Sequence, residues 1–85
     1  MELHYKATVD DEEWEVSSIT VNKEWKLKDL KTAIISANEW VEKSTVSFFR
    51  HESSKRVPLT TGVQRILDGN TEEKPLNLIV VQSGT

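Results

Sequence analysis

The chain has 85 residues, 14 acidic and 11 basic side chains, and no cysteine. A chain of this length forms a single domain, because two independent cores would each be too small to be stable. Without cysteine, neither disulfides nor thiolate metal sites can add stability. The net charge of −3 has the wrong sign for a generic nucleic-acid binder, so we expect no nucleic-acid partner.

Neither a membrane span nor a secretory signal is predicted. The longest apolar run, residues 78–81, is far shorter than the roughly 18–20 residues that cross a bilayer. Residues 1–6 lack the charged start and apolar stretch of a secretory signal. We therefore expect a soluble domain inside the cell, in the cytoplasm or the nucleus.

The first part of the chain predicts an antiparallel hairpin. Apolar and polar residues alternate over residues 3–9, as in a half-buried strand. Residues 10–13 are all acidic and interrupt this pattern as a turn would, and residues 14–21 form a second β-rich run. The alternation changes phase within that run. A bulge near residues 17–18 would explain the change, because one extra residue reverses the facing of those that follow.

A helix is predicted over residues 26–38. Its apolar residues share one face at helical spacing: Leu27, Leu30, Ala33, Ile34 and Ala37. Lys26 is a poor N-cap, so Asp29 is the only residue that favours the positive end of the helix. Asn38 is a suitable left-handed residue at which the helix would stop.

The remaining residues predict three strands and one helical turn. Residues 45–51 are typical of a strand, whereas the proline in residues 56–59 allows only a short edge strand. Residues 63–67 predict a single helical turn, which ends at the turn signal of residues 68–70. Residues 76–82 form the most apolar strand, which we therefore place in the middle of the sheet, beside the first strand.

This order of elements predicts an α+β fold in two layers, because one amphipathic helix can cover only one face of a single sheet. We expect a β-grasp of ββαββ topology. In that fold, one helix packs on a mixed sheet of four or five strands.

Two segments give the chain a resemblance to the ubiquitin-like family. In residues 19–34, a strand end Ile-Thr-Val is followed after four residues by the helix sequence Lys-Leu-Lys-Asp-Leu-Lys-Thr-Ala-Ile. Residues 75–80, Pro-Leu-Asn-Leu-Ile-Val, are similar to the last strand of the family. The resemblance covers nearly all of residues 1–85. It implies one ubiquitin-like domain, which we expect to be the N-terminal domain of a longer protein.

Residues 27–34 and 76–81 are also similar to the N-terminal ubiquitin-like header of Crinkler-type effectors. This resemblance implies an alternative function, as the targeting header of a secreted effector directed at a host. Such a header would precede a separate toxic or enzymatic domain.

In ubiquitin-like domains, the sheet face away from the helix is the usual contact surface. Strand alternation places Phe49 and Ile79 on that face, where they would form an apolar centre rimmed by Lys6, His51 and Asn77. We expect this patch to bind another protein or another domain of the parent chain. The alternative is that Phe49 belongs to the core. The oligomeric state is not predicted by the sequence.

No catalytic, metal-binding or cofactor-binding residues are predicted. His4 and His51 are the only histidines, and neither has metal-ligand partners at a suitable spacing. Gly62, Gly69 and Gly84 are isolated, so the chain has no glycine-rich phosphate loop. We therefore expect a binding module and not an enzyme.

A covalent modifier is a further alternative. Modifiers of the ubiquitin-like type need a flexible tail that ends in an activated glycine. Here Gly84 follows the predicted last strand almost at once, and it is not part of a double glycine. Processing to Gly84 would therefore leave little tail for an activating enzyme to reach.

The three tryptophans are expected to be mainly structural. Trp25 precedes the predicted helix and is placed to pack against it as a hydrophobic staple. Trp40 follows the helix and is expected to close the end of the core. Trp14 lies in the acidic hairpin and is expected to be the most exposed of the three.

Overall fold

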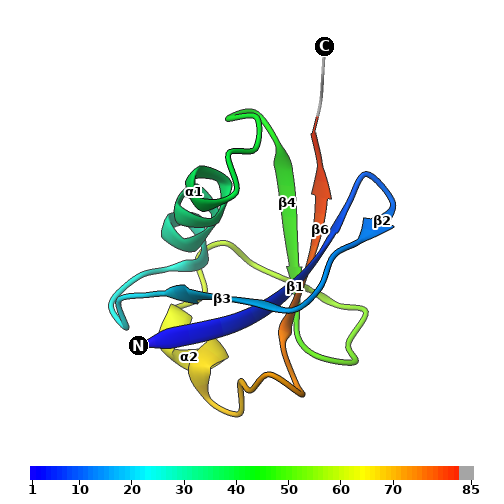
Figure 1. Ribbon diagram of the computed structural model, residues 1–85. Helices are drawn as coiled ribbons and strands as arrows, with labels where there is room; N and C mark the ends of the chain where they lie inside the picture. The colour runs from blue at the N-terminus through cyan, green and yellow to red at the C-terminus, as the bar shows by residue number, and fades with distance from the viewer. Residues whose placement is uncertain (83–85) are drawn as a thin grey trace.

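In the computed structural model, residues 1–82 are described, and they form one mixed sheet of six strands together with two helices (Figure 1). The elements in chain order are β1 (Glu2–Val9), β2 (Glu12–Glu13), β3 (Ser17–Thr20), α1 (Leu27–Ala37), β4 (Thr45–Phe49), β5 (Arg56–Val57), α2 (Val63–Leu67) and β6 (Leu76–Val81). The predicted α+β class with a mixed sheet is confirmed. The sheet has more strands than expected because Glu12 and Glu13, which were predicted to belong to the acidic turn, pair with β1 as the separate strand β2.

The last strand, β6, occupies the centre of the sheet, as predicted. It pairs in parallel with β1 on one side and antiparallel with β4 on the other. Both β2 and β3 pair with the far side of β1, and the short β5 forms the opposite edge beside β4. Leu76, Leu78 and Val80 are buried along β6, which accounts for the central position of the most apolar strand.

The acidic turn is a two-residue hairpin loop. Val9 pairs with Glu12, which leaves Asp10 and Asp11 at the tip with φ of 49° and 69°. Positive φ at both central residues is the mark of a type I′ turn, whose twist matches that of the flanking strands. Asp10 also joins the turn to β6: its N–H donates to the Val80 carbonyl at 2.9 Å, and its carboxylate accepts from the Gln82 N–H at 3.1 Å.

A bulge lies in the second β-rich run, two residues earlier than predicted. The Trp14 N–H donates to the Ala7 carbonyl at 2.9 Å, and Ser17 pairs with Tyr5. Between these two points, residues 15–16 face the single residue Lys6. One extra residue moves the residues that follow it to the opposite face of the sheet. Trp14 and Ile19 can therefore both lie on the helix side, although their positions in the sequence differ by an odd number of residues.

Helix α1 begins as the sequence suggests but ends differently. The Lys26 N–H donates to the Asp29 carboxylate at 3.0 Å, so Asp29 supplies the N-terminal stabilisation that Lys26 lacks. The prediction of a left-handed Asn38 is wrong, since its φ is −99° and the left-handed residue is Glu39, with φ of 55°. The Asn38 side chain instead donates to the hydroxyl of Tyr5 at 3.1 Å.

The end of α1 is a Schellman motif. The Glu39 N–H donates to the Ser36 carbonyl at 3.2 Å, and the Trp40 N–H donates to the Ile35 carbonyl at 3.0 Å. This turn brings the chain back so that Trp40 and Ile35 both join the core. Ala37, which was expected on the buried face, is exposed.

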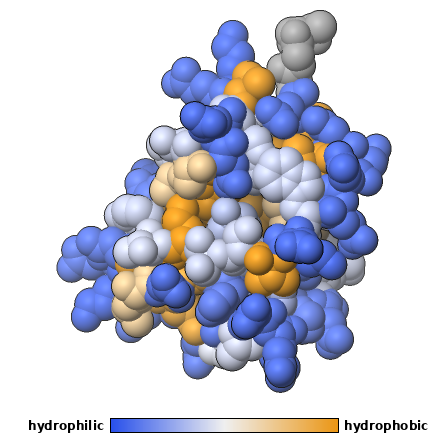
Figure 2. All heavy atoms as spheres, viewed as in Figure 1, coloured by the Kyte–Doolittle hydropathy of each residue, from blue (hydrophilic) through white to orange (hydrophobic). Residues whose placement is uncertain are grey.

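The core lies between the sheet and the two helices, which are on the same side of it (Figure 1). Its buried members from the helices are Leu27, Leu30, Ile34, Ile35, Val63 and Ile66. The radius of gyration is 11.8 Å, and about 12 Å is expected for a compact domain of this length. On the side shown in Figure 2, polar side chains cover most of the surface and apolar ones form smaller groups between them.

The tryptophans lie largely as expected. Trp40 is buried at the end of the core and Trp25 packs partly buried against it. Trp14 is 38% exposed, and its ring centroid lies 5.3 Å from that of Trp40 at a tilted angle. Such aromatic pairs add about 0.5–1.5 kcal/mol beyond the area they bury, so Trp14 contributes to closing this end of the core.

The left-handed conformation of Glu39 leads to a stability prediction. Replacing Glu39 with glycine should raise the free energy of unfolding by about 1 kcal/mol, because glycine adopts positive φ without the steric cost of a β-carbon. Urea denaturation followed by tryptophan fluorescence measures the change.

Glu42→Gly is the matched control, because Glu42 is an exposed residue of the same loop and its φ is not positive. It should lower the free energy of unfolding by up to about 1 kcal/mol, since the added freedom stabilises only the unfolded chain. Equal effects of the two replacements would contradict the assigned conformation of Glu39.

Candidate functional site

The pairing of three strands brings the predicted site residues together on the sheet face away from the helices. Asn77 of β6 pairs with Lys6 of β1 and with Phe49 of β4, so these three residues form one row across the sheet. Ile79 lies in the next row, between Thr8 and Ser47. Neighbouring strands are about 4.8 Å apart, so each row is continuous.

Alternation along the strands determines which side chains reach this face. In β4, Val46 and Phe48 are buried, whereas Phe49 is half-buried. In β6, Leu78 and Val80 are buried, whereas Ile79 is 49% exposed. The alternative in which Phe49 is simply a core residue does not hold, because the fully buried position belongs to Phe48.

An open groove of about 830 Å³ runs over this face. All five predicted residues line it: Lys6, Phe49, His51, Asn77 and Ile79. Val16, which is half-buried, also lines it, and we call Val16, Phe49 and Ile79 its apolar floor. We call this feature the outer-face groove. The sequence predicted that His51 belongs to the strand, but β4 ends at Phe49 and His51 lies in the turn that follows. Its side chain still reaches the rim of the groove.

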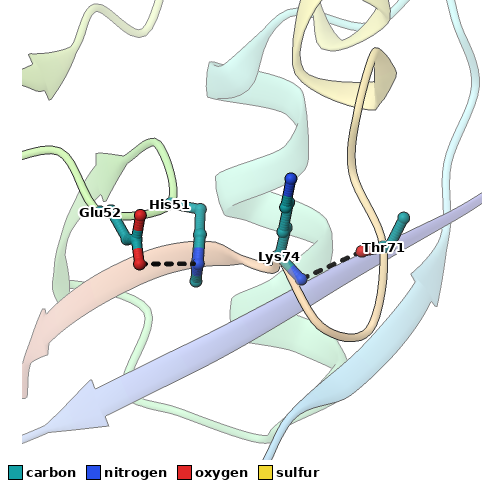
Figure 3. A network of polar contacts seen from close by, with 4 residues as sticks. All are labelled: His51, Glu52, Thr71 and Lys74. Atoms are coloured by element: carbon teal, nitrogen blue, oxygen red, sulfur yellow. Dashed lines mark hydrogen bonds and ion pairs between the residues drawn. The ribbon is translucent and has the colours of Figure 1, made fainter.

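The basic side chains of the rim lie near carboxylates. Lys6 Nζ forms a surface ion pair with Glu13 at 3.5 Å. His51 Nε2 lies 3.7 Å from a carboxylate oxygen of Glu52, and this contact is ionic only when the histidine is protonated (Figure 3). The side chains of Glu13 and Glu52 are 73% and 84% exposed. Exposed pairs of this kind contribute about 0–1 kcal/mol, so both carboxylates remain available for other contacts.

The loop between α2 and β6 supplies the rest of the rim, Glu72 and Glu73. The backbone N–H of Lys74 donates to the Thr71 hydroxyl at 3.0 Å, which closes a tight turn around these two residues (Figure 3). The loop is also fixed to β1, because Asn70 accepts from the His4 N–H at 2.7 Å and donates to the His4 carbonyl at 2.9 Å. The Asn70 side chain thus continues the pairing of β1 at residue 4, just before the start of β6.

Several residues of the groove were not predicted as site residues: Glu13, Val16, Glu52, Glu72 and Glu73. The change of phase in the second β-rich run was a signal for Val16, because a bulge turns one residue outward. The pairs Glu12-Glu13 and Glu72-Glu73 were visible in the sequence. Nothing in the sequence around them indicated that residues of both pairs would reach the same face of the sheet.

Residues 1–82 contain no group of three or more His, Cys, Asp or Glu side chains that could hold a metal ion. No helix within the same residues has the length and apolar character needed to cross a membrane. Gly84, considered above as a processing site, lies outside the described residues.

The chain matches no protein-family model and no curated protein. Its function is therefore inferred from the outer-face groove itself. Apolar side chains in the middle of that groove and charged ones around it are suited to binding, because burial of the centre supplies affinity while the polar rim stays in contact with water.

The bonds of Asn70 lead to a second stability prediction. Asn70→Ala removes two hydrogen bonds, each worth roughly 1 kcal/mol, so the free energy of unfolding should fall by about 2 kcal/mol. Asn77→Ala is the control, because Asn77 is equally half-buried and should change stability by less than about 0.5 kcal/mol. Equal losses in the two variants, measured by thermal unfolding, would show that the His4 contacts do not hold the loop.

Proposed function

We propose that this chain is a ubiquitin-like β-grasp module that binds another protein through the outer-face groove. The topology supports the fold assignment. A hairpin at the start of the chain, a helix across the sheet, and a last strand inserted in parallel beside the first are the arrangement expected of a β-grasp. As a binding module, the chain would serve as a domain of a longer protein.

The observation that carries the proposal is the exposure of Ile79 in the middle of a central strand. Neighbouring strands pair on both sides of it, yet its side chain is 49% exposed. Phe49 and Val16 lie half-buried in the same groove. Apolar side chains gathered in this way on a small domain mark sites of contact with other proteins.

The proposed function includes no chemical step. General acid–base chemistry relies on a group whose protonation is tuned by burial and by its neighbours. The four glutamates of this groove are exposed to solvent, and Glu13 forms a surface ion pair with Lys6. Their arrangement favours recognition over catalysis.

Ile79→Ala tests the proposal. The replacement should weaken binding to a partner by about tenfold or more, because central apolar residues carry most of the affinity of an interface. The free energy of unfolding should fall by less than about 1 kcal/mol, since half of this side chain is already in contact with water. Partners captured by the wild-type domain would be purified, and their affinities measured by calorimetry.

Val81→Ala is the matched control. Val81 is on the same strand and is 50% exposed, but it does not line the outer-face groove. Its replacement should leave affinity within about twofold of wild type, as for contacts outside a binding centre. Equal affinities of the two variants would show that partners bind elsewhere.

A further inference from the structure

We infer that the outer-face groove accepts a short segment of a partner protein in which one or two apolar side chains are flanked by lysine or arginine. This inference rests on the proposed function and adds the chemistry of the partner. It follows from the charge of the rim, from the position of the rim around the apolar floor, and from the contrast with the neighbouring cavity.

The excess negative charge of the chain is concentrated in this groove. Four glutamates line it, together with one lysine: Glu13, Glu52, Glu72, Glu73 and Lys6. With histidine neutral, the groove carries a formal charge of −3, from four carboxylates and one ammonium group. The whole chain also carries −3. The remaining ten basic and ten acidic side chains cancel, so the rest of the molecule has no net charge.

The carboxylates are placed around the apolar floor and not within it. Glu13 stands at the β1 side, where its strand partner is Thr8. Glu52 follows β4, and the pair Glu72 and Glu73 precedes β6. Because β4 and β6 are antiparallel, these last three lie at the same end of the sheet. A partner segment that lies across Ile79 would therefore have Glu13 on its β1 side and the other three carboxylates at one end of the sheet.

These carboxylates are available to a partner. Within residues 1–82, neither Glu72 nor Glu73 takes part in an ion pair. Glu13 and Glu52 have partners at 3.5 and 3.7 Å but stay largely exposed. A lysine or arginine from another protein can approach them without first displacing a buried contact, and complementary charge raises both the rate of association and its selectivity.

The neighbouring cavity shows that the acidic character is local. It is smaller, about 290 Å³, and shares His51, Glu52 and Pro75 with the groove. Its other charged side chains are Arg50, Lys74 and Asp68, so its basic groups balance its acidic ones. The excess of carboxylates is therefore a feature of the groove and not of this cavity.

Three labelled peptides of equal length test the inference. The first has a central Leu-Phe pair flanked by lysines, the second has the same pair flanked by glutamates, and the third keeps the lysines but has Ser-Gly at its centre. The first should bind at least about tenfold more tightly than either of the others, because only it matches both the floor and the rim. Fluorescence anisotropy gives the affinities, and amide shifts of Val16, Phe49 and Ile79 report where the peptide binds.

A charge-matched pair of variants tests the role of the rim. Glu72→Gln combined with Glu73→Gln should lower the affinity for the first peptide by about threefold to tenfold and should make this affinity less sensitive to salt. Glu24→Gln with Glu42→Gln changes the net charge equally, at exposed residues outside the groove, and should leave the affinity within about twofold of wild type.

The outcomes separate the inference from the proposed function. Equal binding of the lysine-flanked and glutamate-flanked peptides at the groove would overturn the inference and leave the proposed function standing. No amide shift in the groove at about 1 mM of the first peptide, a concentration that reveals even weak complexes, would also overturn it. In that case the comparison of Ile79→Ala with Val81→Ala still decides whether partners use this face.

Discussion

β6 pairs with β1 on one side and with β4 on the other, so the two halves of the sheet are joined through its six residues. Its register assigns Leu78 to the core and Ile79 to the outer face. A shift of one residue would exchange these positions and expose the buried face of the strand. The packing that stabilises the core and the placement of the apolar floor are therefore consequences of the same register.

The bulge opposite Lys6 connects the core with the groove in a second way. It lets Trp14 lie on the helix side, where it packs on Trp40, while Val16 lines the outer face. The extra residue thus allows Trp14 to pack on the helix side of the sheet and Val16 to line the groove on the other side.

The patterns of apolar residues, together with the turn and proline signals, predicted α1, the short α2 turn, every strand except β2 and the central position of β6. The same alternation placed Phe49 and Ile79 on the outer face. It did not place Glu39 at the end of α1, since that position is decided by the return of Trp40 to the core. Nor could it bring Glu13 and Glu72 to one rim, because they belong to segments that meet only in the folded sheet.

The groove combines strand residues, whose positions are determined by the sheet, with exposed side chains of the connecting segments. Phe49 and Ile79 are strand residues whose positions are fixed by pairing on neighbouring strands, so a partner would find them preorganised and would lose little entropy in ordering them. Glu52 and the pair at residues 72–73 belong to connecting segments with exposed side chains, which can follow the charges of a partner. In the proposed complex, the floor would therefore determine how long a partner stays bound, whereas the rim would determine how fast it arrives and which charge it must carry.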